Sequence, residues 1–222
     1  MKKLVLFLLF IVLGTVGLVA QEKDQIKEQD RDRIMLVDGD VLQIRDHNQI
    51  RLQDKITLND GTIVNPDGTY ISKDQIKLRL RDGFCLDSDG ILYRNEYQYR
   101  YKIQKENKGL SGAQIQERNQ NRYHVMTIEG ELYQIRNQSQ NKLQNQLKLN
   151  NGVVINPDGT YQDRNRNKLR LKEGECLNYD GKMFKNNYMH RKMVVQKNKT
   201  MIQKKVQKKP ISKKNMKKGG NK

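Results

Sequence analysis

The chain has 222 residues, a formal net charge of +18 and only two cysteines. The charge is uneven, because residues 182–222 contain 15 Lys and Arg and no Asp or Glu, whereas residues 21–180 have a net charge of only +1. This distribution excludes a uniformly basic domain and assigns the high pI to a C-terminal tail. Two cysteines are also too few to complete a metal site on their own.

The first twenty residues have the pattern of a secretory signal peptide. A basic start at residues 1–3 precedes the apolar run Leu4–Ala20, and the polar sequence QEKDQ follows. The alternative is an uncleaved membrane anchor, since the run is about as long as the shortest spanning helices. Gly14, Gly17 and Ala20 favour cleavage. We therefore expect export to the periplasm or outer cell envelope, with no transmembrane span after signal cleavage.

The segment from Ile34 to Lys108 repeats without a gap at an offset of 91 residues. For example, VNPDGTYISKDQIKLRLRDGFCLDSDG at positions 64–90 becomes INPDGTYQDRNRNKLRLKEGECLNYDG at positions 155–181. Self-similarity at a fixed period indicates repeated structural units. The predicted organisation is a signal peptide at 1–20, a polar N-terminal spacer at 21–33, copy 1 of a β-repeat domain at 34–107, a polar linker at 108–122, copy 2 at 123–188 and a basic C-terminal tail at 189–222.

Each copy contains turn signals separated by strand-length runs. Asp-Gly favours tight hairpins, because Gly adopts positive φ without a Cβ penalty and Asp tolerates it. Leu78 and Leu80 alternate with basic residues, as expected for a strand with one packed and one solvated face. We predict an all-β fold of two tandem antiparallel β-hairpin or meander repeat domains, followed by a disordered or partly helical basic tail. The predicted turn-forming residues are Asp60, Gly61, Asp67, Gly68, Asp89, Gly90, Gly152, Asp158, Gly159, Asp180 and Gly181.

A row of aromatic residues follows the repeated motifs in copy 1. By parity, Tyr93, Tyr97, Tyr99, Tyr101 and Ile103 fall on one face of a predicted strand. An exposed row of this kind stacks on sugars or bases, whereas a buried row packs in a core. Copy 2 does not keep the row, which favours packing.

Two motifs recur in both copies. They are L-x-D/N-G-x-x-V/I-x-P-D-G-T at Leu58–Thr69 and Leu149–Thr160, and L-x-x-G-x-C-L-x-x-D-G at Leu80–Gly90 and Leu171–Gly181. With these motifs the chain resembles a family of small exported bacterial domains, domain of unknown function 6799, present here in two tandem copies. The resemblance implies an envelope protein typical of Bacteroidota and supplies no catalytic residues. The family is often rich in Met, and this chain departs from it in that respect.

Cys85 and Cys176 occupy equivalent positions in the two copies. In an exported protein they are candidates for a disulfide that joins the copies. Duplication alone also produces equivalent positions, and a predicted strand accepts Cys as a small buried apolar residue. Both interpretations remain open at this point.

A loose group of soft metal ligands lies near the end of copy 2. Met183, Met189, His190 and Met193 are of the types that copper prefers, although a scattered strand and tail pattern accounts for the same residues. Asp87-Ser88-Asp89-Gly90 resembles a fragment of a calcium loop, but it lacks the later ligands and is interpreted as a turn. No cofactor is predicted.

The histidines and carboxylates do not assemble into a catalytic set. We therefore predict a non-enzymatic envelope protein, a scaffold or binding module whose tail meets an anionic surface of lipid head groups or acidic glycan, or an unidentified envelope protein. Export argues against nucleic acid as the partner. The alternative is a periplasmic soft-metal-binding or metal-stress protein. The predicted surface-binding lysines are Lys204, Lys205, Lys208, Lys209, Lys213, Lys214, Lys217 and Lys218.

Overall fold

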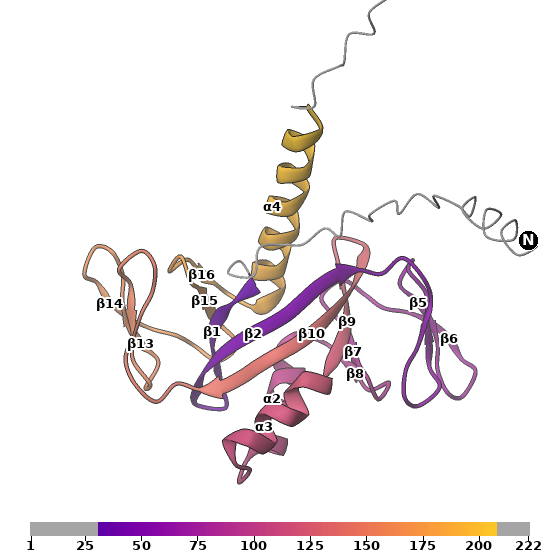
Figure 1. Cartoon of the computed structure of the whole chain (residues 1–222), viewed down its shortest axis with the longest axis horizontal. Coiled ribbons are helices and arrows are strands. Elements are labelled where there is room, and N and C mark those ends of the chain that lie inside the picture. The colour runs from indigo at the N-terminus through magenta and orange to yellow at the C-terminus, as the bar shows by residue number, and fades with distance from the viewer. Residues whose placement is uncertain (1–30, 208–222) are drawn as a thin grey trace, which may run out of the picture.

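The computed structural model describes residues 31–207 (Figure 1). The predicted signal peptide, most of the predicted spacer and the end of the predicted tail lie outside the described residues. Copy 1 supplies β1 (Arg33–Val37), β2 (Asp40–Arg51), β3 (Ile56–Thr57), β4 (Ile63–Val64), β5 (Thr69–Ile71), β6 (Lys77–Arg79), β7 (Cys85–Asp87), β8 (Leu92–Tyr93) and α2 (Glu96–Asn107).

Helix α3 (Gly112–Asn121) follows and leads into copy 2. Copy 2 supplies β9 (Tyr123–Ile128), β10 (Glu131–Lys142), β11 (Leu147–Lys148), β12 (Val154–Ile155), β13 (Thr160–Gln162), β14 (Lys168–Arg170), β15 (Cys176–Asn178), β16 (Met183–Phe184) and α4 (Asn187–Gln207). The predicted fold class is confirmed, since antiparallel sheets form two tandem halves and part of the tail is helical.

Eight strands form the central sheet in the order β16-β15-β1-β2-β10-β9-β7-β8. Each strand on one side of the β2–β10 pair has its repeat equivalent on the other side, so a pseudo-two-fold axis passes between β2 and β10. Two four-stranded sheets lie at opposite ends of the central sheet (Figure 1). We call β3–β6 the first lobe and β11–β14 the second lobe.

The two copies exchange their first hairpins. β1 of copy 1 pairs with β15 of copy 2, where Met35 lies opposite Cys176. β9 of copy 2 pairs with β7 of copy 1, where Met126 lies opposite Cys85. The two tandem copies therefore share one central sheet, in which each copy completes the strands of the other.

The cores follow the same exchange. Ile34 and Leu36 of β1 pack into the core of the second lobe, with Leu149 and Ile155. On the opposite face of β1, Met35 and Val37 belong to a hydrophobic cluster against which residues of α2 and α4 pack. Both faces of β1 are covered, which explains why this strand is apolar at every position after its first residue.

Two-residue turns close both long hairpins. Asp38 and Gly39 have φ values of 53° and 75°, and their equivalents Glu129 and Gly130 have 52° and 76°. Positive φ at both central positions is the type I′ turn, whose twist matches that of paired strands. These turns fix the registers of β1 with β2 and of β9 with β10.

Tyr93 lies on β8, whereas the rest of the tyrosine row, from Tyr97 to Ile103, lies on helix α2, so the prediction of one strand was wrong. The packing interpretation is confirmed for Tyr93, Tyr99 and Ile103, which are buried. The buried positions of this helix are Glu96, Tyr99, Arg100, Ile103 and Asn107, which recur at helical spacing. Most of them are polar, and an apolar-periodicity pattern does not detect such a face. The alternation of the tyrosines along the sequence therefore does not mark the face of a strand.

Three predicted boundaries also change. Arg33, assigned to the spacer, is the buried first residue of β1. The predicted linker 108–122 contains helix α3, which starts with a capping box between Ser111 and Gln114. Helix α4 begins at Asn187, before the predicted start of the tail.

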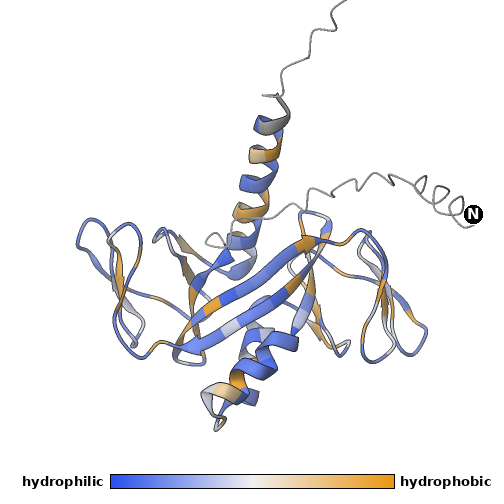
Figure 2. Cartoon of the chain, in the orientation of Figure 1, coloured by the Kyte–Doolittle hydropathy of each residue, from blue (hydrophilic) through white to orange (hydrophobic). Residues whose placement is uncertain are grey.

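Hydrophilic residues dominate the long central strands β2 and β10 (Figure 2). The half of β2 from Arg45 to Arg51 contains one apolar residue, Ile50. The polar side chains in the middle of the sheet therefore need hydrogen-bond and ion-pair partners from other elements. Within residues 31–207, no helix combines the length and apolarity needed to span a membrane.

Candidate functional site

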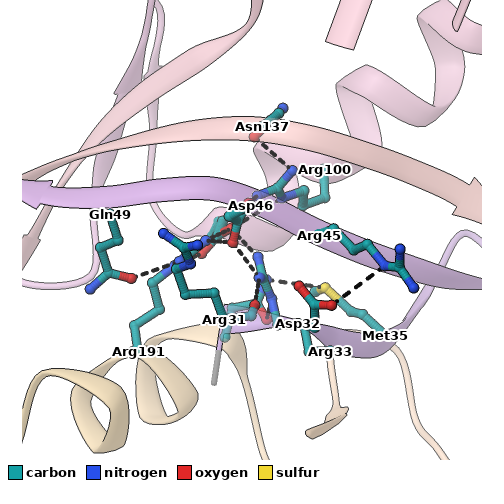
Figure 3. Close-up of polar contacts among 12 residues, drawn as sticks. Arg31, Asp32, Arg33, Met35, Arg45, Asp46, Gln49, Arg100, Asn137 and Arg191 are labelled. Atoms are coloured by element: carbon teal, nitrogen blue, oxygen red, sulfur yellow. Dashed lines mark hydrogen bonds and ion pairs between the residues drawn. The ribbon is translucent and has the colours of Figure 1, made fainter. Parts of the chain in front are cut away.

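A cluster of ionised side chains lies buried beside the pseudo-two-fold axis (Figure 3). Each of its five members is at most 1% exposed, and they come from β1, β2, α2 and α4: Arg33, Asp46, Glu96, Arg100 and Arg191. We call this set the buried ion cluster. It ties the last helix of copy 2 to the first strands of copy 1.

Each carboxylate of the buried ion cluster contacts all three guanidinium groups. Asp46 lies 2.6 Å from Arg33, 2.9 Å from Arg100 and 2.9 Å from Arg191, measured between nitrogen and oxygen atoms. Glu96 Oε1 lies 2.6, 2.8 and 2.7 Å from nitrogen atoms of the same three arginines. Charge-assisted bonds of this length are strong and directional.

Neutral amides accept further N–H groups of the arginines. Arg33 Nε donates to Asn187 Oδ1 at 2.7 Å, and Arg100 Nη1 donates to Asn137 Oδ1 at 3.0 Å. Arg191 Nη1 donates to the side-chain oxygen of Gln49 at 2.8 Å. These amides extend the network into β10 and α4.

The repeat offset shows how the two copies diverged at this point. Asp46 corresponds to Asn137 and Glu96 corresponds to Asn187, so copy 1 supplies both acids and copy 2 supplies amides. Arg100 corresponds to Arg191, whereas Arg33 corresponds to His124. The pseudo-symmetric cluster is thus asymmetric in charge.

The protonation states follow from burial and from the arginines. Burial alone would raise the pKa of Asp46, but Arg191, Arg33 and Arg100 outweigh it and hold that pKa below its ordinary value. The same balance holds the pKa of Glu96 well below its ordinary value. Both acids are therefore ionised, and the buried ion cluster carries a net charge of +1.

Two buried histidines flank the cluster and are neutral. Desolvation by burial lowers the pKa of His124 and of His190 to about 3 in each case. His124 packs against the Tyr99 ring, with centroids 4.5 Å apart, and His190 packs edge-on against Phe184, with centroids 5.2 Å apart. Their surroundings are those of core residues.

The four predicted soft-metal ligands have different environments. Met183 and Met189 are 42% and 49% exposed, whereas His190 is fully buried. Met193 packs against the hydrophobic cluster that contains Met35 and Phe184. Within residues 31–207, His, Cys, Asp and Glu side chains do not form a group of three or more that would hold a metal ion.

The two cysteines are free and buried, which corrects the disulfide hypothesis. Four strands separate β15 from β7, so the thiols lie roughly 24 Å apart at a strand spacing of about 4.8 Å. A disulfide requires Cα atoms within about 7 Å. Burial raises the pKa of Cys176 to about 12 and that of Cys85 well above its usual range. These thiols fill space in the core.

The predicted turn residues form tight turns. Their glycines have positive φ at Gly61, Gly68, Gly90, Gly152, Gly159 and Gly181. The carboxylates of Asp67 and Asp158 accept hydrogen bonds from the backbone N–H and hydroxyl of the threonine two residues later. In the fragment that resembles a calcium loop, Asp87 is occupied by two backbone N–H groups, the Tyr93 hydroxyl and Lys102.

Of the predicted tail lysines, Lys204 is exposed on α4. The side chains of the others lie outside the described residues: Lys205, Lys208, Lys209, Lys213, Lys214, Lys217 and Lys218.

The fold defines a class of antiparallel β protein in which two tandem copies exchange hairpins across a pseudo-two-fold axis. The chain belongs to the family described as Domain of unknown function (DUF6799), whose model matches residues 31–92 and 122–183. Searches of curated proteins and of solved structures gave no match. The matched segments include Arg33 and Asp46 but end before α2 and α4, which supply Glu96, Arg100 and Arg191.

Proposed function

We propose that this protein is an exported, non-enzymatic envelope protein, a binding module or scaffold that α4 and the residues beyond it hold against an anionic surface. The observation that carries the proposal is the position of α4, which stands away from the central sheet in Figure 1. Every ionisable residue after Asp180, apart from a tyrosine and a histidine, is Lys or Arg.

The first half of α4 is packed firmly against the rest of the protein. Val194 and Val195 are 2% exposed, and Arg191 belongs to the buried ion cluster. Lys192 and Lys199 pair with Glu129 and Glu131 at 3.0 Å. From Gln196 onward most of the helix is exposed, so its basic end is directed away from the body.

The burial of the ion cluster supports a non-enzymatic role. Its charged groups are at most 1% exposed and bond to one another and to buried amides. Catalytic acids and bases must reach the proton that they transfer, and these groups have no exposed surface on which to meet a substrate.

The test compares two variants of the full chain that have equal net charge. The tail variant changes six lysines to Gln at 208, 209, 213, 214, 217 and 218, and the body variant changes six exposed lysines to Gln at 55, 73, 108, 148, 182 and 185. Binding is measured by co-sedimentation with phosphatidylglycerol–phosphatidylcholine vesicles and with phosphatidylcholine vesicles alone. A second arm uses immobilised polygalacturonate, which separates a lipid source of negative charge from a glycan source.

We expect the tail variant to lose at least about 100-fold in affinity for the anionic vesicles at low salt, because each lysine near such a surface contributes about 1 kcal/mol. Salt should release the parent protein, since exposed charges are screened over about 10 Å at 0.1 M. Equal losses in the tail and body variants, or unchanged binding of the tail variant to both surfaces, would overturn the proposal.

A further inference from the structure

The hairpin that joins β13 to β14 and its continuation carry a dense group of cations. Five of the nine residues from 164 to 172 are basic and exposed: Arg164, Arg166, Lys168, Arg170 and Lys172. Within residues 31–207 none of these five forms an ion pair, whereas Lys105 and Lys142 on the body pair with Asp38 and Asp40. The second lobe therefore presents cations that form no ion pair within the described residues, and only Arg170 lies near enough to a carboxylate, that of Asp158, to help lower its pKa.

A groove of about 610 Å³ lies over the strands next to this hairpin. We call it the second-lobe groove. Its lining contains no carboxylate. Apart from the largely buried Tyr161, its polar residues are two cations, three amides and one hydroxyl: Lys168, Arg170, Gln146, Asn156, Gln162 and Thr160.

Several of these polar groups are held in place by the protein. Gln146 Nε2 donates to Asn156 Oδ1 at 2.8 Å, and Asn156 Nδ2 donates to Thr160 Oγ1 at 3.0 Å. Arg170 Nη2 donates to the Asp158 carbonyl at 3.2 Å. A guanidinium group has five N–H donors, so this one bond orients Arg170 and leaves most of its donors for a ligand.

The chemistry of the groove selects among anionic partners. Tyr161 is 8% exposed and packs in the lobe core, so the groove lacks the exposed aromatic platform on which single-stranded nucleic acids stack. Its amides and hydroxyl suit a ligand that carries many hydroxyl groups, and its cations suit carboxylates. We propose that the second-lobe groove binds an acidic polysaccharide, at a site separate from α4 and the tail.

The first lobe is a natural comparison within the same chain. It keeps the two groove cations as Lys77 and Arg79. It has Ile71 at the position of Gln162, and Asp74 stands in its hairpin where the second lobe has Asn165. The second-lobe hairpin also has one acid, Asp163 in place of Ser72, and its extra cation is Arg166 in place of Gln75. The first lobe is thus less basic and more apolar, which assigns the polysaccharide site to the second lobe.

The test measures binding of the full chain to polygalacturonate by biolayer interferometry, with dextran and poly-L-glutamate as comparison polymers. The variant Lys168→Gln/Arg170→Gln is compared with Lys77→Gln/Arg79→Gln, which makes the same charge change at equivalent positions. A third variant, Gln162→Ile, installs the first-lobe residue without changing charge. Circular dichroism verifies that each variant is folded.

We expect Lys168→Gln/Arg170→Gln to weaken polygalacturonate binding at least about tenfold, and Gln162→Ile about threefold, as expected for lost hydrogen bonds. Lys77→Gln/Arg79→Gln should change it less than about twofold. Dextran should not bind, and the tail variant should preserve the difference between the two lobe variants. Vesicle binding by the lobe variants should be unchanged, which separates this site from the tail.

Two outcomes would overturn the proposal. Equal losses in the two lobe variants would mean that net charge alone attracts the polymer. Equal affinity for poly-L-glutamate and polygalacturonate would mean that carboxylates are bound without recognition of the sugar.

Discussion

At the scale of single residues, the buried ion cluster depends on an unequal division of charge between the copies. Three arginines face two acids, and the two positions where copy 2 would supply further acids hold Asn137 and Asn187. Burying charges costs free energy that mutual attraction only partly returns. The buried ion cluster therefore specifies which elements meet rather than adding net stability. Removal of one partner leaves a buried charge unpaired, and the protein then loses the full free energy of burying that charge.

Asp46→Asn tests this dependence. The substitution leaves three buried arginines with one acid, so we expect the free energy of unfolding to fall by about 3–5 kcal/mol. Urea denaturation is the measurement, because urea does not screen charge. Asp54→Asn is the matched control, since Asp54 is exposed and surface changes usually stay within about 0.5 kcal/mol. A loss below about 1 kcal/mol for Asp46→Asn would contradict this account.

The buried histidines predict a loss of stability in acid. The pKa of each is about 3 in the folded protein, against 6.5 for an unperturbed histidine. Between pH 3 and pH 6.5 these histidines are protonated in the unfolded chain and neutral in the folded protein. The stability that they contribute is therefore fully present above pH 6.5 and falls as pH drops toward 3. The expected slope is about 1.4 kcal/mol per pH unit for each histidine.

Urea denaturation at a series of pH values measures this slope. His190→Gln should reduce it by about one histidine's share, roughly 1.4 kcal/mol per pH unit. His47→Gln makes the same substitution at an exposed position and is the control. The same slope in both variants would rule out a buried, neutral His190.

At the scale of elements, local signals predicted the strands and turns well. Asp-Gly turns close several hairpins in both copies, among them β4–β5 and β12–β13, because tight turns are determined by the few residues within them. Helix α2 escaped prediction because its buried face contains Glu96, Arg100 and Asn107, whose partners come from distant elements. Helix α3 begins at a capping box within a sequence that reads as a polar linker.

The sequence contains only a weak signal for the buried ion cluster. The acids at 46 and 96 become Asn at 137 and 187, which removes two negative charges from copy 2. Such a change between copies of one domain signals positions where the copies have different neighbours. Its meaning appears only in three dimensions, because Arg191 lies 145 residues from Asp46.

At the scale of the whole molecule, the exchanged hairpins make the two copies one cooperative unit. β1 completes the core of the second lobe, and β9 completes that of the first. The sequence could not reveal this exchange, since β1 and β9 have similar patterns and either partner would satisfy them. Non-local pairing is decided by the connection and by the total of all contacts.

A nick between the copies tests this unity. A protease site inserted between Gly109 and Leu110, in the turn between α2 and α3, allows the folded full chain to be cut. We expect the cut protein to elute from a sizing column with the uncut protein and to separate only in denaturant, because each half contributes strands to the core of the other. The uncut insertion variant is the control, and separation of the halves in native buffer would disprove the exchange.

The exchanged hairpins also determine when each part of the chain can fold during its synthesis from the N-terminus. Met35 finds Cys176 as its partner, so the opening hairpin must wait until nearly all of the described protein has been synthesised. Pairings between such distant segments form slowly. Most of the polypeptide must thus be made before the core of the second lobe can form. Under the export proposed above, this delay would keep the chain unfolded enough to pass through a translocation pore.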